Sequence, residues 1–505
     1  MSPPATGTRL HTLFDTWLVR DPQRVLLRCA DGDVTIAALG AMVDVLQAEL
    51  RADGVGPGDR VLIIAENCPA HVALILAISR LGAWSCGVNA RMAPGELAAF
   101  LAKADARVAY FTSGVSAAAA AHAERHHPRS SVLPDLQRSA ARPEAVAETG
   151  VLAAQVAAII FTSGTTGTPK GVLMTHDGVT HFARVSAQSR ALGPDDRVYA
   201  YLPMTHIFGL GTVLMASLHA GASLVMRSQF DPDDLLQSLA TQGVTQLQGP
   251  PTLFARLLAH LEQQGRSRVD APHLRYLYTG AGPLDLALKR RIEAAFGQPL
   301  QHGYGLSEYA GSTALTRRGE WREDTAAGFV VDGAELRVVD PATGGTLPAG
   351  ERGEIWMRGR GLMPGYFRDP EATAAVMREG GWYASGDLGE WAPDGAIRVV
   401  GRLKEMIIRS GFNVYPGEVE AALNAWPAIA RSAVVGRPEG DGNEEVLAFV
   451  ELRHGAVLDE AALRAHLRDA LAPYKRPARV QVMAELPMTA SGKILKRALL
   501  RGLDA

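Results

Sequence analysis

Cysteine is scarce in this 505-residue sequence, which contains only Cys29, Cys68 and Cys86. The three are far apart and form neither a CxxC pair nor a zinc-ligand spacing, so a disulfide framework and a structural zinc site are excluded. Buried thiols in a reducing compartment are expected instead. Net charge is also small, at −2, which argues against nucleic acid or an anionic membrane as the main partner.

Long hydrophobic runs are absent as well. The longest in the middle of the chain, residues 207–218, is shorter than the roughly 20 residues that a bilayer-spanning helix needs. The amino terminus begins Met1-Ser2-Pro3-Pro4 and has no basic segment followed by an apolar one, so we expect no signal peptide and a cytoplasmic protein. A chain of this length is too long to fold around one hydrophobic core, so two or more domains are expected.

A dense polar stretch follows a strand-like run. Residues 156–161 are apolar and predict a buried strand, and residues 161–172 are Phe-Thr-Ser-Gly-Thr-Thr-Gly-Thr-Pro-Lys-Gly-Val. Glycines let backbone N–H groups approach an anion, hydroxyls add donors, and the lysine supplies a charge for a phosphate. The stretch predicts a polyphosphate-binding loop; an exposed turn is the disfavoured alternative. It is not a Walker A loop, because Pro169 and Gly171 stand where that loop requires Gly and Ser or Thr.

This stretch resembles the signature Tyr/Phe-Thr-Ser-Gly-Thr-Thr-Gly-x-Pro-Lys-Gly of the adenylate-forming enzymes. That family includes acyl-CoA synthetases, peptide-synthetase adenylation domains and firefly luciferase, and the match is complete. The resemblance implies that ATP is bound here. It implies a catalytic role for Thr165 and nucleotide contacts from Thr162, Ser163, Gly164, Thr166, Gly167 and Lys170.

Another motif, His302 to Glu308, resembles the family pattern Tyr-Gly-x-Thr-Glu, with serine in place of threonine. A tyrosine between glycines can stack on a purine, a serine can bond a phosphate, and a glutamate can hold Mg²⁺. The resemblance therefore implies a nucleotide site that includes Gly303, Tyr304, Gly305 and Ser307, with Glu308 as catalytic residue and metal ligand.

Further family motifs complete the expected nucleotide site. The loop Gly280-Ala281-Gly282 follows a strand expected over residues 274–279 and would border the adenine. Asp387, a carboxylate in a tight turn, would accept the ribose hydroxyls, and Arg402 would contact the ribose or a phosphate. For Asp387 alone, an aspartate that caps its own turn remains the alternative.

The segment from Tyr201 to His206 resembles the motif that opens the helix walling the family's acyl pocket. His206 is given a catalytic role on that basis; a satisfied structural histidine is the alternative. The expected pocket residues are Ile207, Phe208, Leu247, Ala310 and Gly311. Together with Gly303, the small residues predict a roomy, apolar pocket for a fatty or aromatic monocarboxylic acid, although they could instead serve close backbone packing. No Arg or Lys stands beside His206 or just after Tyr304 to bind a second carboxylate.

Alternating helices and strands over residues 9–110 predict a parallel, doubly wound α/β sheet, with helices over 10–18, 35–50 and 71–81 and a strand over 61–65. Residues 113–150 predict a surface helix and a linker. A helix there could aim His122 and His126 at one metal ion, but solvated histidines are favoured because no further ligand completes a site.

The last hundred residues predict a small α+β unit. By resemblance, residues 1–402 form an adenylation domain with doubly wound sheets, and residues 403–505 form a mobile lid domain hinged at Lys404. Lys493 would bridge the attacking carboxylate and the α-phosphate, and coenzyme A would contact Ser410, Gly411, Arg437 and Tyr474. Without the resemblance, Lys404 would be an ordinary surface lysine, and Lys493 part of a basic terminal helix.

These features predict an ATP-dependent acyl-CoA ligase that forms an acyl-adenylate and then a thioester, with ATP, Mg²⁺ and coenzyme A as cofactors. No carrier domain is expected after Lys493, which favours free coenzyme A as the acceptor. The alternatives are a stand-alone enzyme that passes the acyl group to a carrier protein, a luciferase-like oxidase, and a non-catalytic nucleotide-binding regulator. A regulator is disfavoured because Glu308 and Lys493 are present. Homodimer formation is left open.

Overall fold

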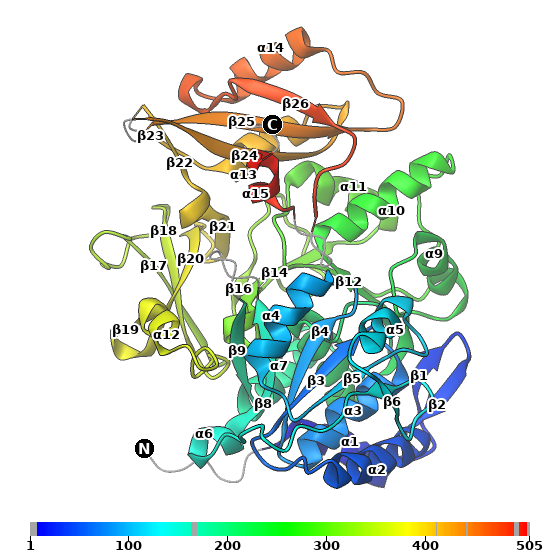
Figure 1. The fold of residues 1–505 in the computed structure, drawn as a ribbon. Helices are drawn as coiled ribbons and strands as arrows, with labels where there is room; N and C mark the ends of the chain where they lie inside the picture. The colour runs from blue at the N-terminus through cyan, green and yellow to red at the C-terminus, as the bar shows by residue number, and fades with distance from the viewer. Residues whose placement is uncertain (1–7, 163–168, 411, 441–442, 489–493, 502–505) are drawn as a thin grey trace.

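The computed structural model describes residues 8–162, 169–410, 412–440, 443–488 and 494–501. Figure 1 shows a broad lower body that contains most of the chain and a smaller upper domain formed by its last hundred residues. Both are α/β structures, so the expected division into a large amino-terminal and a small carboxyl-terminal domain is confirmed.

One sheet of the lower body is built around the expected strand after Asp59. Its seven strands run in the order β6-β7-β5-β3-β4-β8-β9. The central strands β5, β3, β4 and β8 are parallel, whereas β9 returns antiparallel to β8. Every residue of β3 is buried, as expected for a strand covered on both faces. The bounds are β3 (Arg60–Ala65), β4 (Trp84–Asn89), β5 (Val108–Phe111), β6 (Arg129–Ser130), β7 (Gln137–Arg138), β8 (Val156–Thr162) and β9 (Lys170–Thr175).

A second, nine-stranded sheet has the order β16-β15-β14-β13-β12-β10-β11-β1-β2. Strands β1 and β10 to β14 pair with one another in parallel, whereas β2 at one edge and β15 and β16 at the other are antiparallel. The bounds are β1 (Val25–Cys29), β2 (Gly32–Thr35), β10 (Arg197–Ala200), β11 (Ser223–Met226), β12 (Gln246–Gly249), β13 (Tyr276–Thr279), β14 (Leu300–Leu306), β15 (Gly311–Leu315) and β16 (Phe329–Val330).

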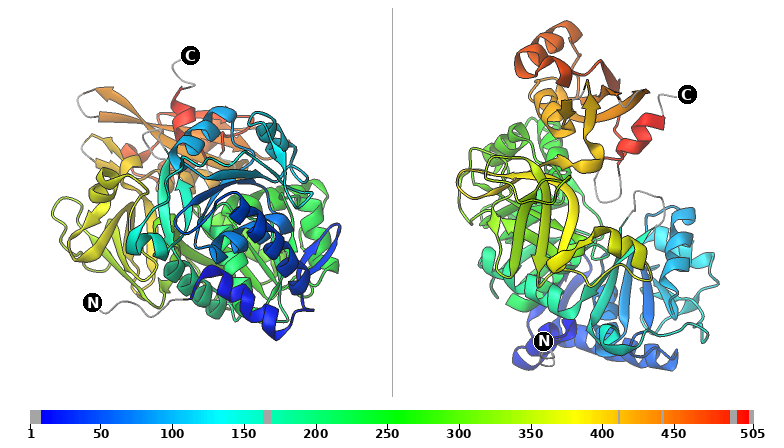
Figure 2. Two further views of the ribbon diagram at one scale, coloured as in Figure 1. Left: turned by 60° about the horizontal axis from the view of Figure 1, so that its bottom comes forward. Right: turned by 90° about the vertical axis from the view of Figure 1, so that its left-hand side faces the viewer.

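Helices cover these sheets in layers (Figures 1 and 2). The three expected amino-terminal helices are α1, α2 and α3; Thr35 caps α2 by accepting a hydrogen bond from the Ala38 N–H. The bounds are α1 (Leu10–Arg20), α2 (Ile36–Ala52), α3 (Pro69–Arg80), α4 (Pro94–Ala104), α5 (Ala117–Glu124), α6 (Gly150–Gln155), α7 (His176–Ser189), the π-helix η1 (Phe208–Met215), α8 (Ala216–Ala220), α9 (Pro232–Thr241), α10 (Pro251–Gln263) and α11 (Leu286–Phe296).

A third sheet, β17-β18-β20-β19 with β21 paired to β20, leads to the carboxyl-terminal domain. The elements of this part of the chain are β17 (Ala334–Val339), β18 (Gly353–Gly359), α12 (Pro370–Val376), β19 (Met377–Arg378), η3 (Glu379–Gly381), β20 (Trp382–Trp391) and β21 (Ile397–Arg402). The short helix η2 (Ser307–Tyr309) lies earlier, between β14 and β15. The short turn η4 (Leu403–Glu405) then joins β21 to the upper domain.

The upper domain has a hairpin, a three-stranded sheet and flanking helices around its own apolar core. The sheet order is β24-β25-β26 (Figure 1). The bounds are β22 (Ile407–Arg409), β23 (Phe412–Val414), α13 (Pro416–Asn424), β24 (Ile429–Gly440), β25 (Asn443–Leu452), α14 (Glu460–Ala470), η5 (Pro473–Lys475), β26 (Arg479–Met483) and α15 (Lys496–Arg501).

The expectation of a linker over residues 113–150 is wrong in part. Strands β6 and β7 extend the first sheet there, and Arg138 of β7 pairs with Asp53 at the end of α2. His122 is buried rather than solvated, and its Nε2 lies 3.0 Å from the Met92 carbonyl oxygen. No group of three His, Cys, Asp or Glu side chains that could hold a metal occurs within the described ranges.

Of the helices in the described part of the chain, none has the length and hydrophobicity to cross a membrane. Cys68 and Cys86 are buried, and Cys29 is partly buried, so the expectation of buried thiols holds for two of the three.

Candidate functional site

Three side chains expected at the nucleotide come together where the second and third sheets meet. Tyr304 on β14 donates its hydroxyl to Asp387 Oδ2 on β20, with the oxygens 2.8 Å apart. Arg402, the last residue of β21, places Nε 3.0 Å from Asp387 Oδ1, because the strand register sets these two residues opposite each other. Burial and the Asp387 charge raise the pKa of Tyr304 well above its ordinary value, so its hydroxyl stays a donor.

The backbone around Asp387 differs from the expected tight turn. Asp387 lies within the ten-residue strand β20, directly after Gly386 in the left-handed region at φ 71°. The strand is irregular here, and the Ser385 hydroxyl accepts the Asp387 N–H at 3.0 Å. A carboxylate at such an irregularity is turned out of the regular alternation and toward Tyr304.

A second cluster joins Lys170, at the end of the expected phosphate-binding stretch, to the expected metal ligand Glu308. Lys170, the first residue of β9, places Nζ 4.8 Å from the centre of the Tyr366 ring. The Tyr366 hydroxyl donates to Glu308 Oε1 at 3.0 Å and lies 3.4 Å from the Tyr383 hydroxyl. Tyr366 therefore separates a lysine from a carboxylate that would otherwise attract each other, and it contacts both.

His206 precedes the π-helix η1 and is held by backbone groups. Its Nδ1 accepts the Phe208 N–H at 3.2 Å, and its carbonyl accepts the Leu210 N–H at 2.9 Å. A neutral ring that accepts at Nδ1 carries its proton on Nε2. The ring is half-buried.

The residues expected around an acyl group form a layer between η1 and the second sheet. The Phe208 ring packs edge-on against Tyr278 of β13, with centroids 5.9 Å apart. A Cβ placed on Gly303 would lie 2.4 Å from the Tyr278 hydroxyl, and one placed on Gly311 would lie 2.4 Å from the Phe182 ring. Both glycines are thus already in close contact with aromatic rings, which is the packing alternative raised from the sequence.

Leu247 stands apart from this layer. The strand register pairs Leu247 with Leu277 and Gln248 with Tyr278. Because side chains alternate between the faces of a strand, Gln248 shares the face of Tyr278 and Phe208, and Leu247 points to the other face. Leu247 is therefore on the sheet face opposite Phe208, and its expected place in the acyl pocket stays a prediction. Ala310 and Ile207 are buried, Ala310 in the left-handed region at φ 55°.

The residues expected to act as the hinge and to contact coenzyme A lie in several elements of the upper domain and its connection. Lys404 is exposed in η4, as a pivot requires. Ser410 lies in the β22–β23 hairpin, and Phe412 of that hairpin stacks on Tyr474 with ring centroids 4.5 Å apart. Arg437 on β24 forms an ion pair with Glu445 on β25.

Some expected site residues lie outside the described residues, namely Ser163, Gly164, Thr165, Thr166, Gly167, Gly411 and Lys493. Thr162 and Lys170, which flank the stretch expected to bind phosphate, are opposite each other in the β8–β9 pair. The loop after β13 has Ala281 in the left-handed region at φ 63° between two glycines. Ser307 is buried and Gly305 half-buried beside Glu308.

Sequence reasoning missed four residues of this region: Tyr366, Tyr278, Gln248 and Arg190. The sequences Gln246-Leu247-Gln248 and Tyr276-Leu277-Tyr278 alternate polar and apolar residues, which is the one signal that could have placed polar side chains on a single sheet face. Nothing in the sequence around Arg190 or Tyr366 indicates their contacts, which depend on distant residues.

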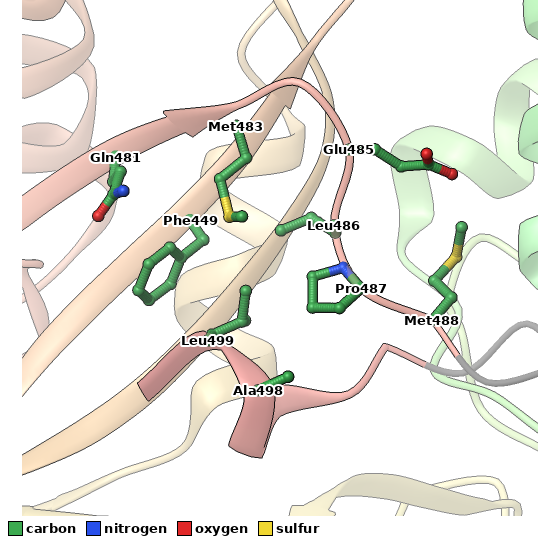
Figure 3. A pocket seen from close by; sticks show the side chains of 9 residues that line it. All are labelled: Phe449, Gln481, Met483, Glu485, Leu486, Pro487, Met488, Ala498 and Leu499. Carbon is green, nitrogen blue, oxygen red and sulfur yellow. The ribbon is translucent and has the colours of Figure 1, made fainter. Parts of the chain in front are cut away.

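A hollow of about 550 Å³ lies in the upper domain between β25, β26 and α15 (Figure 3). The lining is mostly apolar: Phe449, Gln481, Met483, Glu485, Leu486, Pro487, Met488, Ala498 and Leu499. Since it has no cationic side chain for a phosphate and none of the residues expected at the nucleotide, we do not place ATP there.

The residues around Glu308 fit a magnesium ion. Mg²⁺ in nucleotide sites is usually held by one or two carboxylates together with substrate phosphates. Glu308 supplies one half-buried carboxylate, with Lys170 nearby for the phosphates. The set lacks the several carboxylates of a dedicated metal cage, which agrees with a metal that arrives with ATP.

Comparison with known proteins gives two family matches. The family model for the AMP-binding enzyme matches residues 14–367, and that for the AMP-binding enzyme C-terminal domain matches residues 418–493. A feruloyl-CoA synthase from Amycolatopsis is 35% identical over 486 residues, which cover 95% of this chain and 97% of that enzyme.

Comparison with solved structures agrees with these family matches. ATP-bound MatB from Rhodopseudomonas palustris superposes with a TM-score of 0.85 at 30% identity and covers 98% of this chain and 99% of its own. Apo MatB from the same organism, at the same identity and coverage, gives a TM-score of 0.75. Because the sequence is shared, the difference between these scores is one of conformation.

Proposed function

The chain belongs to the AMP-binding enzyme family, and on that premise we propose that it activates a carboxylic acid with ATP and transfers the acyl group to coenzyme A. The family match covers both domains, and the feruloyl-CoA synthase relative is matched over nearly its whole length. The observation that carries the site assignment is the convergence of Tyr304 and Arg402 on Asp387, beside the Lys170–Tyr366–Glu308 cluster.

The chemistry requires that two anions meet. A carboxylate is a poor electrophile. Its oxygen attacks the α-phosphate of ATP, the bond between the α- and β-phosphates breaks and pyrophosphate leaves, and the resulting acyl-adenylate has AMP as its leaving group. Lys170 would neutralise phosphate charge, and Lys493 would bridge the carboxylate and the α-phosphate. Asp387 and Arg402 would fix the ribose, and the Tyr304 ring would lie beside the base. The thiol of coenzyme A then attacks the carbonyl carbon, and AMP leaves.

Glu308 would hold the magnesium ion that accompanies ATP. The ion supplies positive charge that offsets the phosphates during attack. Tyr366 orients the Glu308 carboxylate through its hydroxyl and keeps Lys170 apart from it, so that both charges remain directed at the nucleotide.

The arrangement of the two domains corresponds to the adenylate-forming half-reaction in this proposal. Its support is the higher TM-score against the ATP-bound than against the apo relative. Arg352 on the lower body pairs with Glu418 on α13, and Asn424 donates to Asp285 at 3.4 Å, so contacts across the two domains accompany this arrangement. Lys404 lies between the two family matches, where a hinge between residues 1–402 and 403–505 would be needed.

The acid proposed is a fatty or aromatic monocarboxylic acid, with free coenzyme A as acceptor. Phe208 and Phe182 provide apolar surface beside the second sheet. The feruloyl-CoA synthase relative supports an aromatic acid.

The testing experiment is a screen of pyrophosphate release over carboxylic acids of varied length and ring content, with and without coenzyme A. We expect pyrophosphate with several acids, and acyl-CoA product only when coenzyme A is present. Lys493→Ala should slow adenylate formation by about 10²-fold or more but spare thioester formation from a supplied acyl-adenylate. Release of no pyrophosphate with any acid would refute the proposal.

A further inference from the structure

A buried arginine that forms no ion pair within the described part of the chain lies beneath the acyl layer. Arg190 follows α7 and is 1% exposed. Its three hydrogen bonds to described residues end on uncharged oxygens: Nε donates to the Ser186 carbonyl at 3.0 Å, Nη2 to the Thr212 carbonyl of η1, and Nη1 to Gln248 Oε1. Its other two N–H donors have no acceptor in the described ranges. Burial of a charged group whose hydrogen bonds end on neutral oxygens is costly.

This contact fixes which way the Gln248 amide faces. An arginine has no acceptor atom, so the atom of Gln248 that it bonds must be the oxygen. The Gln248 Nε2 is then directed away from Arg190, and it is buried with no hydrogen-bond partner among the described residues. Gln301 Nε2, on the far side of Tyr278 in β14, is likewise buried with no partner among the described residues.

The strand register places these groups on one face. Gln248, Tyr278 and Gln301 are aligned across β12, β13 and β14, so all three point to the side where η1 lies. Tyr278 contacts Phe208 and sits against Gly280 and Gly303, and its hydroxyl is 3.3 Å from Ser312 Oγ. The face therefore runs from the loop expected at the adenine down to Arg190.

The unpaired groups around Gln248 are mainly donors. Two amide N–H₂ groups and two arginine N–H bonds have no acceptor among the residues that the structure describes, and unsatisfied buried donors in a native protein call for a ligand or water. A purely alkyl acid would leave them unpaired. An acid with an oxygen at the right depth would satisfy them.

We infer that Gln248, supported by Arg190 and flanked by Tyr278, forms a polar floor of the acyl pocket that binds an acceptor oxygen at the end of the acid remote from its reacting carboxylate. The inference rests on the proposed function, and it replaces the expectation of an apolar pocket. The bound oxygen is that of a ketone, an ether or a second carboxylate, all of which share the acceptor chemistry.

Matched acids test the floor directly. We would measure kcat/KM for adenylate formation with hexanoate, octanoate and decanoate, with the 5-oxo, 7-oxo and 9-oxo acids of the same lengths, and with the corresponding dicarboxylates. In at least one length we expect the oxygen-bearing acid to exceed the alkyl acid by about tenfold, as one buried hydrogen bond can provide. The oxo and dicarboxylate arms distinguish a neutral from a charged oxygen.

Gln248→Glu tests the residue. The glutamate keeps a partner for Arg190 but removes the amide donors, so the fold is retained and the preference for the oxygen-bearing acid should fall about tenfold. Direct binding of the preferred acid, measured by calorimetry without ATP, should weaken in parallel. Gln237→Glu, the same change at an exposed site on α9, is the matched control and should alter neither.

The outcomes separate the two proposals. Absence of pyrophosphate with every acid refutes the proposed function itself. Turnover in which the alkyl acid is preferred at all three lengths, or a Gln248→Glu variant with an unchanged preference, overturns the polar floor and leaves the ligase assignment intact.

Discussion

The Tyr366 hydroxyl orients the carboxylate of Glu308, the expected metal ligand. It donates to Glu308 Oε1 while its ring lies under Lys170. Tyr366→Phe removes the hydrogen bond and keeps the ring. Since a hydrogen bond to a charged group contributes about 1.5–3 kcal/mol, we expect adenylate formation to slow about tenfold or more, with a higher Mg²⁺ requirement. Pyrophosphate release measured against Mg²⁺ concentration checks this.

The matched control is Tyr309→Phe. Tyr309 is also buried, and its hydroxyl donates to the Gly333 carbonyl at 2.9 Å. It should lose some stability but keep the Mg²⁺ dependence of the wild type. If the two variants shift that dependence alike, Tyr366 does not position Glu308.

The buried side chain of His71 makes the stability of the protein depend on pH, which can be tested. It lies on α3, is fully buried, and burial lowers its pKa from 6.5 to about 4. Its folded-state pKa is below the unfolded value, so its contribution to stability is present above pH 6.5 and is lost as pH falls through 4. From pH 6.5 to 5 this one group should cost about 1.5 kcal/mol of unfolding free energy.

Urea unfolding at several pH values measures this slope. His71→Met should flatten it between pH 6.5 and 5, whatever the variant does to stability at pH 7. His454→Met, at an exposed site in the upper domain, should leave the slope unchanged. A His71→Met profile parallel to that of the wild type would contradict the assignment.

The β14–β15 hairpin is the element whose small residues were expected to leave space for the acid. Gly311 has φ 147°, and its position is pressed against Phe182 of α7. Gly311→Leu should therefore destabilise the protein through backbone strain of about 1–3 kcal/mol and a similar overlap with the ring. Phe182→Ala in the same chain should recover the overlap part, as denaturant unfolding of the single and double variants would show.

A substitution at a second glycine distinguishes the cost of backbone strain from the cost of overlap with the Phe182 ring. Gly395 has φ 82° but nothing within 4 Å of its Cβ position. Gly395→Leu should show the strain alone, and Phe182→Ala should not relieve it. Strictly additive losses for Gly311→Leu and Phe182→Ala would show that the ring is not what fills the space.

Elements were easier to predict than contacts. Apolar periodicity and caps placed α1, α2, α3 and β3, because these signals are local. The pairing of β9 with β8, the edge strands β6 and β7, and the opposite faces of Leu247 and Gln248 depend on register, which short-range patterns leave open. The order of the family motifs predicted that Tyr304, Asp387 and Arg402 belong to one site. It did not predict the contacts of Arg190 and Tyr366, because their partners are distant in sequence.

The whole molecule must change its domain arrangement if one site serves two half-reactions. The upper domain is joined through η4, with Lys404 exposed in the turn, and Arg352–Glu418 is an ion pair between the two domains. The present arrangement is closer to the ATP-bound than to the apo relative. Rotation about the turn would have to break such contacts before coenzyme A could reach the adenylate.

Lys404→Pro should separate the half-reactions. Proline fixes φ near −65°, which a 3₁₀ turn already requires, so the present arrangement should persist and adenylate formation should continue. The rotation needs a different φ at the pivot, so thioester formation from a supplied acyl-adenylate should fall by about 10²-fold or more, as expected when a required conformational step is blocked. Lys404→Gln removes the charge without restricting φ and should spare both reactions. Single-turnover measurements of each half-reaction decide the matter: wild-type turnover by Lys404→Pro, or an equal loss in Lys404→Gln, would move the hinge elsewhere in the connection between β21 and β22.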